Sequence, residues 1–180
     1  NKSIEVTKLS SLVADNMAIT GDVMFSAGLR VDGRIQGNVV SEQGGHGLLV
    51  LSEKGTIHGS VKAWDAVING TITGDLEVEH FLELQANARV TGNITYRQMQ
   101  LDCGAAVEGK LVCGYHGLEM GCEGKTLAMP GQRVRGFPPV AAYPVIERFG
   151  FVWVWPGEAA LADPALLPSL AWAEDPAWAF

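Results

Sequence analysis

Basic residues and long apolar runs are both scarce in this sequence. Only 13 Lys and Arg stand against 20 Asp and Glu, which gives a formal net charge of -7. Because phosphate binding needs clustered positive charge, we expect no nucleic acid partner. The most strongly apolar stretch, "FGFVWVWPG" at 149–157, is far shorter than the ~20 residues that span a bilayer. The sequence therefore predicts no transmembrane segment, and it leaves membrane association open.

Cysteine is rare, and methionine is missing from the start of the chain. The three cysteines are Cys103, Cys113 and Cys122, an odd number with no secretory pattern before them. This favours a reducing, cytoplasmic location over a disulfide framework. Because the chain begins at Asn1, we expect its natural N-terminus to lie upstream.

Glycine, by contrast, is abundant and regularly spaced. A phrase of apolar, any, Gly, any and apolar residues recurs, as in "ITGDV" and "IQGNV". Its central glycines are Gly21, Gly37, Gly59, Gly74, Gly92 and Gly109. Apolar residues alternate within each copy, which is the period of a β-strand. A repeat of about 18 residues with this alternation predicts a β-solenoid of six windings. The one long interval contains "SEQGGHG" (41–47), which we expect to be a loop at a corner.

The phrases "VDGRIQGNV", "NGTITGDLEV" and "ARVTGNI" make residues 3–111 resemble the bactofilins, a family of bacterial cytoskeletal proteins. The resemblance implies an all-β, right-handed triangular β-helix at 18–111, after an N-terminal tail at 1–17, and end-to-end filament assembly without nucleotide. Terminal windings expose unpaired backbone N–H and C=O groups that can hydrogen-bond to another subunit, which also favours end-to-end assembly. The expected partner is the chain itself. We expect the assembly surface to comprise apolar residues of the end windings: Ile19, Val23, Phe25, Leu101, Val107 and Leu111.

A different segment begins at residue 112, where the glycine phrase stops and prolines follow from Pro130 onward. The stretches "VCGYHGLEMGCEGK", "MPGQRVRGFPP" and "VIERFGFVWVWPG" resemble the second half of a Rieske iron–sulfur domain of the vanillate O-demethylase type. We expect an incomplete antiparallel β subdomain at 112–157 and a Pro- and Ala-rich tail at 158–180. Alternating aromatic residues at 149–155 predict a β-hairpin within the subdomain.

The resemblance implies metal binding by Cys113 and His116, which match the family's Cys-x-x-His loop. A Rieske [2Fe–2S] centre needs two Cys on one iron and two His on the other. The family's first pair, Cys-x-His, would fall at 93–97, inside "GNITYRQ", where neither ligand is present. We therefore expect no cofactor unless another chain supplies that pair. A mononuclear zinc or iron site with Cys122 as third ligand is an alternative. Cys103, in phase with apolar neighbours, is expected to be a wall residue of the solenoid.

Two functions follow from these observations. The first is structural: a polymer-forming scaffold subunit that carries an inactive Rieske fragment and has no enzymatic activity. The second is a Rieske-type electron-transfer or oxygenase component for aromatic O-demethylation or ring hydroxylation. Oxygenases of that type activate oxygen at a mononuclear iron in a later domain, which the 180 residues do not include. The sequence favours the structural function, and the appended segment is placed to block assembly at the last winding.

Overall fold

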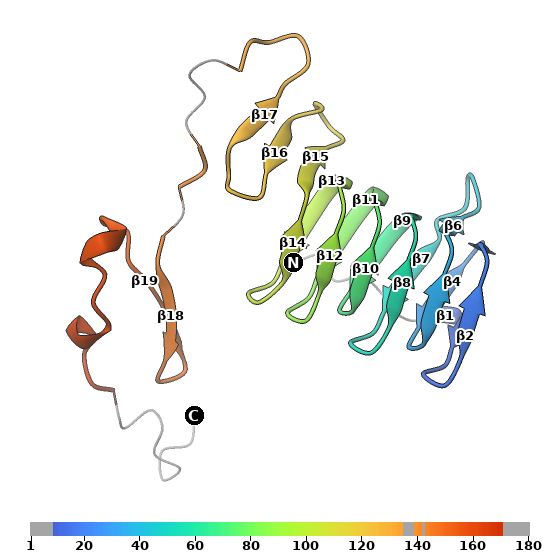
Figure 1. The fold of residues 1–180 in the computed structure, drawn as a ribbon, viewed down its shortest axis with the longest axis horizontal. Coiled ribbons are helices and arrows are strands. Elements are labelled where there is room, and N and C mark those ends of the chain that lie inside the picture. The colour runs from blue at the N-terminus through green and yellow to red at the C-terminus, as the bar shows by residue number, and fades with distance from the viewer. Residues whose placement is uncertain (1–8, 135–138, 142, 171–180) are drawn as a thin grey trace. The chain divides into compact units, whose positions relative to one another are not determined.

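The computed structural model describes residues 9–134, 139–141 and 143–170 of the chain (Figure 1). The chain divides into two compact units, Asn1–Pro139 and Val140–Phe180. The described residues form β-strands and two short 3-10 helices, so the predicted all-β class is confirmed. Within these ranges, no helix is long and apolar enough to cross a membrane.

The first unit is a parallel β-solenoid of six windings, as the glycine repeat predicts. Each winding contributes a strand to each of three faces, which gives a triangular cross-section. The first face is a sheet of six parallel strands (Figure 1). These strands are β2 (Ala18–Thr20), β5 (Arg34–Gln36), β8 (Thr56–His58), β10 (Thr71–Thr73), β12 (Arg89–Thr91) and β14 (Ala106–Glu108).

The second and third faces are joined, because three long strands turn the corner between them. These strands are β9 (Val61–Ile68), β11 (Leu76–Leu84) and β13 (Ile94–Leu101). The second face also contains β3 (Val23–Phe25), β6 (Val39–Ser41) and β15 (Lys110–Cys113), and the third contains β1 (Leu9–Val13), β4 (Gly28–Val31) and β7 (Leu48–Leu51). A register shift between Val78 and Phe81 bends β11 at this corner. The predicted loop 41–47 extends from the same corner, between β6 and β7 (Figure 1).

β1 lies within the stretch 1–17 that the sequence analysis assigned to a tail. It pairs in parallel with β4, and Val13 at its end is only 5% exposed. The strand therefore adds a third face to the first winding. Its sequence, "LSSLV", carries no glycine phrase, which is why the repeat pattern does not reveal it.

Aliphatic side chains from the three faces fill the interior of the solenoid. Equivalent residues stack in register, so that Ile35 lies on Ile57 and Ile57 lies on Ile72. All three are 0% exposed. Burial of such columns removes apolar surface from water, which is the main driving force for folding. Each winding therefore stabilises its neighbours.

The repeat glycines form a column at the corner between the first and second faces. Their φ angles lie between +122° and +155°, a region that side-chain-bearing residues avoid. From the second glycine onward, a Cβ atom would also overlap the carbonyl oxygen of the glycine one winding earlier, as Gly59 does with Gly37. Backbone conformation and close stacking thus both require glycine, which explains the phrase.

A column of polar side chains follows the glycines. The backbone N–H of Asn38 donates to Oδ1 of Asp22 at 2.7 Å, and that of Ser60 donates to Oδ1 of Asn38 at 2.9 Å. Further along, the N–H of Asn93 donates to Oδ1 of Asp75 at 2.9 Å. Each side chain satisfies a backbone donor where the strands are interrupted by the corner.

The parallel order ends at β15. Its outer edge pairs antiparallel with β16 (Glu119–Gly121), which pairs antiparallel with β17 (Thr126–Ala128). The two strands continue the row of the second face beyond the last winding (Figure 1). The start of the appended segment is therefore part of the first unit.

The second unit is an antiparallel hairpin of β18 (Val145–Arg148) and β19 (Phe151–Val154), as the alternating aromatic residues predict. Phe149 and Gly150 form its turn with φ angles of 59° and 74°. The 3-10 helices η2 (Ala159–Leu161) and η3 (Pro164–Leu166) follow. Part of the predicted tail, 171–180, lies outside the described residues.

Candidate functional site

The loop with Cys113 and His116 forms the turn from β15 to β16. The backbone N–H of Cys113 donates to the Leu118 carbonyl at 2.9 Å, and the Gly117 N–H donates to the Cys113 carbonyl at 2.7 Å. Cys113 is half-buried, whereas His116 is exposed and packs edge-on against the Tyr115 ring with 4.2 Å between centroids. Backbone hydrogen bonds therefore hold this loop as a tight turn.

The stretch expected to carry the other two Rieske ligands lies directly beside this loop. β13 pairs with β15 so that Ile94 is opposite Leu111 and Tyr96 is opposite Cys113. Ile94 is 0% exposed and belongs to the solenoid core. Burial, and to a lesser extent the nearby Cys113 thiol, raises the pKa of Tyr96 above its usual value. Wall residues of the solenoid therefore occupy the place where ligands would be needed.

The residues near the loop do not fit a Rieske cluster, because two Cys and two His are required. In the part of the chain that the structure describes, no three His, Cys, Asp or Glu side chains gather as a metal site. Cys122 faces the corner after β14, where its Sγ lies 2.7 Å from the Gly109 carbonyl oxygen and 3.1 Å from that of Val107. The structure thus does not bring Cys122 together with Cys113 and His116.

Cys103 is not a wall residue, so that prediction is wrong. The side chain is exposed in the turn between β13 and β14. The turn, with Gly104 at a φ of 99°, interrupts the alternation of the strands. Counting alternate residues back from Val107 through this turn therefore gives the wrong orientation.

The expected assembly residues lie at the two ends of the solenoid. In the first winding Phe25 is buried, and Ile19 and Val23 are half-buried against the core. In the last winding Leu101 is 48% exposed, and Val107 and Leu111 are half-buried. Their counterparts in the middle windings, such as Ile57, are 0% exposed. The end windings therefore retain apolar exposure that internal windings lack.

The N-terminal end of the solenoid also presents strand edges. Among the described residues, β1, β2 and β3 each pair with a single strand, on the side of the next winding. Exposed apolar side chains lie on or beside them: Leu12 (57%), Met17 (47%) and Met24 (76%). These three residues lie outside the expected assembly surface, because the repeat pattern marks only inward positions.

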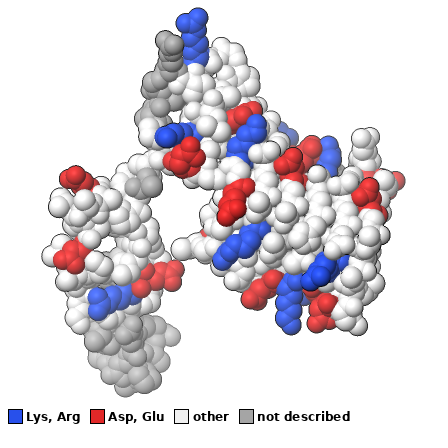
Figure 2. Space-filling view, in the orientation of Figure 1, with Lys and Arg blue, Asp and Glu red and all other residues white. Residues whose placement is uncertain are grey.

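An aromatic cluster lies at the outer corner between the second and third faces. Trp64 stacks on His80 with 5.5 Å between the ring centroids. His46 packs edge-on against Trp64 in the same cluster, with 4.6 Å between the ring centroids. Nδ1 of His80 lies 2.7 Å from Oδ1 of Asp65. The cluster fastens loop 41–47 to the third and fourth windings. Elsewhere on the surface seen in Figure 2, acidic and basic side chains are interspersed.

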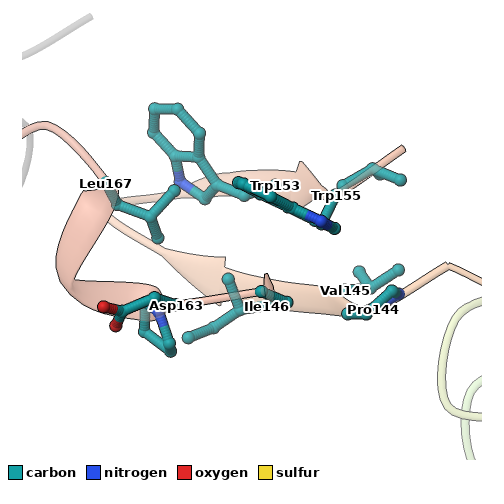
Figure 3. A pocket seen from close by; sticks show the side chains of 10 residues that line it. Pro144, Val145, Ile146, Trp153, Trp155, Asp163 and Leu167 are labelled. Atoms are coloured by element: carbon teal, nitrogen blue, oxygen red, sulfur yellow. The ribbon is translucent and has the colours of Figure 1, made fainter. Parts of the chain in front are cut away.

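The second unit contains an apolar pocket of about 280 Å³ (Figure 3). It lies between the hairpin and the segment 162–167 that contains η3, with Ile146, Trp153, Trp155 and Leu167 among its walls. The indole Nε1 groups of Trp153 and Trp155 donate to the carbonyl oxygens of Arg148 and Glu158, each at 3.0 Å. Because those donors are already satisfied, the indoles present mainly carbon surface to the pocket.

These features define the first unit as a parallel β-solenoid whose first strands have apolar residues and, among the described residues, no strand on their outer side. A family profile described as "Bactofilin: Polymer-forming cytoskeletal" matches residues 11–112. The match covers more than half of the chain, which therefore belongs to the bactofilin family. No solved structure matches the chain.

A second likeness links the chain to oxygenase components. It is 64% identical over 85 residues to the vanillate O-demethylase oxygenase subunit of Pseudomonas sp. (strain HR199 / DSM 7063), covering 47% of this chain and 24% of that protein. It is 40% identical over 86 residues to the dicamba O-demethylase oxygenase component of Stenotrophomonas maltophilia, covering 46% and 25%. The chain thus spans about a quarter of the length of these relatives. A bactofilin solenoid is joined to part of an oxygenase-like sequence, as the motifs predict.

Proposed function

We propose that the chain is a structural subunit that associates with copies of itself through the ends of the solenoid, in the bacterial cytoplasm. The observation that carries this proposal is the first winding. Its three strands pair on one side only with strands that the structure describes, and exposed apolar side chains lie on or beside them. Backbone N–H and C=O groups on such edges gain partners when another strand pairs with them. Membership of a family described as polymer-forming and cytoskeletal supports the same conclusion.

We further propose that the oxygenase-like segment has no Rieske function here. Its Cys113 and His116 loop is intact, but Ile94 and Tyr96 of the neighbouring strand belong to the wall of the solenoid. Introducing ligands at such positions would replace packed side chains of the last windings. Holding the core and holding a cluster are therefore competing demands on this strand.

Sedimentation analysis and negative-stain electron microscopy of the purified chain test the structural function. We expect self-associated particles whose mass increases with protein concentration. Substitution of Met24, 76% exposed on β3, by Arg should weaken this association, because charges on edge strands oppose pairing. Val50→Arg is the matched control, since Val50 is a partly exposed strand residue of an internal winding. A purely monomeric chain at all concentrations would overturn the proposal.

A second candidate is a Rieske-type component whose missing Cys-x-His pair comes from another chain. The high identity to vanillate O-demethylase oxygenase subunits favours it. Protein purified with iron, acid-labile sulfide and a visible absorption band that depends on Cys113 would support this function. Protein that stays colourless and free of sulfide when it is isolated together with its bound partners and reconstituted anaerobically with iron and sulfide would exclude it.

A further inference from the structure

We infer that the hairpin β16–β17 caps the C-terminal end of the solenoid and restricts self-association to the N-terminal end. The inference rests on the proposed self-association and names its partner, a second copy of the chain joined through the first winding. It predicts that assembly stops at two copies.

The cap occupies the edge that a further winding would use. On the second face, β16 pairs with the outer edge of β15 through Lys110 and Gly121, Leu111 and Met120, and Val112 and Glu119. This pairing is antiparallel, whereas every internal winding pairs in parallel. Another copy therefore cannot add its strand to β15 without displacing β16.

Side-chain contacts hold the cap at this edge. Nζ of Lys110 lies 2.9 Å from Oε2 of Glu119, and both side chains are about two-thirds buried at 38% and 31% exposure. At the turn between β16 and β17, Cys122 lies against the Gly109 and Val107 carbonyl oxygens. The turn thus reaches the corner between the first and second faces. One face is closed directly, and the neighbouring corner is covered.

The N-terminal end differs in each of these respects. Its three edge strands, β1, β2 and β3, have no described strand on their outer sides. Two first windings that meet about a two-fold axis offer the same edges and the same apolar residues to each other. Such an interface is closed, since each copy contributes the end that carries no cap. At the other end, β14 and residues 98–101 of β13 also have no described outer strand, but a winding that docks there meets β16 on the second face. The occupant that completes the N-terminal end is therefore a second copy.

The test compares three forms of the full chain by sedimentation equilibrium and electron microscopy. Met120→Pro removes the backbone N–H of the central residue of β16 and is incompatible with an interior strand. Met120→Val keeps that N–H and is the matched control. We expect the unmodified chain and Met120→Val to stop at dimers. For Met120→Pro we expect the weight-average mass to rise about twofold or more, because freed ends join dimers to one another.

A second pair of variants opens the cap without proline. Glu119→Lys places like charges at the Lys110 contact, and Lys110→Glu combined with Glu119→Lys restores the pair. We expect a smaller mass increase in the single variant, which reverses in the double variant. Thermal melting followed by circular dichroism checks that the solenoid remains folded in each variant. If Met120→Pro proves to be misfolded, the comparison of Glu119→Lys with the double variant tests the cap instead.

The outcomes separate the cap from the proposed function. Filaments formed by the unmodified chain, or dimers unchanged in all opened variants, would overturn the cap while leaving self-association intact. Monomers in every form, including the opened ones, would overturn the proposed function itself. Dimers that lengthen only when the cap is opened support both.

Discussion

The solenoid and the hairpin of the second unit are both built from alternating apolar residues, yet the surroundings of those residues differ. In the solenoid, Ile57 is stacked between equivalent residues of adjacent windings and is 0% exposed. In the hairpin, Phe151, Val152 and Val154 are 49%, 59% and 55% exposed. A strand-forming pattern therefore yields a stable core only where another layer covers it.

The difference follows from how each region obtains that layer. A repeat supplies its own neighbours, because every winding buries the one before it. The oxygenase-like segment spans only about a quarter of its relatives' length, and its hairpin has two strands. Isolated two-stranded hairpins are marginally stable in water. We therefore expect substitutions in the solenoid to have much larger effects than equivalent substitutions in the hairpin.

The largest effect is expected at the glycine column. A Cβ at Gly59 would overlap the Gly37 carbonyl oxygen, and φ is also 150°. Gly59→Ala should therefore lower the free energy of unfolding by more than about 4 kcal/mol. Chemical denaturation followed by circular dichroism measures this loss.

Gly21 provides the matched control for Gly59. It has a φ of 122°, but nothing lies within 4 Å of its Cβ position, because no glycine of an earlier winding lies beneath it. Gly21→Ala should cost only the backbone strain, about 1–2 kcal/mol. Equal losses at the two positions would show that contact between windings is not what requires glycine.

The second effect compares the two cores directly. Ile57→Ala should cost about 2–5 kcal/mol, because it removes a fully buried side chain and leaves a cavity. Ile146→Ala in the hairpin, where the side chain is 36% exposed, should cost less than about 1 kcal/mol. Differential scanning calorimetry of both variants measures the shifts. A comparable loss at Ile146 would mean that the hairpin has a better-covered core than its exposure indicates.

Much of the solenoid could be predicted from sequence because the spacing of the repeat glycines gives the length of each winding. The interval of 17 between Gly92 and Gly109 also fixes the stacking of Ile94 on Leu111 and of Tyr96 on Cys113. The sequence repeat was therefore enough to predict that the Cys113 and His116 loop lies beside the solenoid strand that contains Tyr96. β1 was not, because "LSSLV" lacks the phrase and is recognised only by its pairing with β4.

The remaining differences arise where periodicity ends. Cys103 was placed on the wrong side because the turn at 102–104 interrupts strand alternation. The antiparallel pairing of β16 with β15 lies where the bactofilin match ends, at residue 112, and the glycine repeat does not continue. No repeat relates Leu111 to Met120, so their pairing requires the three-dimensional structure. The sequence thus predicts that the appended segment blocks the last winding, but the strand pairing by which it does so requires the structure.

The smallest effect is expected at the polar column, where the repeat stabilises corners rather than the core. Asn38 Oδ1 accepts from the backbone N–H of Ser60 at 2.9 Å on an exposed corner. Asn38→Ala should cost about 0.5–1.5 kcal/mol, since water replaces part of the lost hydrogen bond. Gln36→Ala, an exposed amide of the same winding, should change stability by less than about 0.5 kcal/mol. Urea denaturation of both variants decides the point. Identical urea midpoints for the two variants would show that the polar column adds no stability beyond solvation of its side chains. A loss of stability in Asn38→Ala alone shows that hydrogen bonds repeated from winding to winding stabilise the corners of the solenoid.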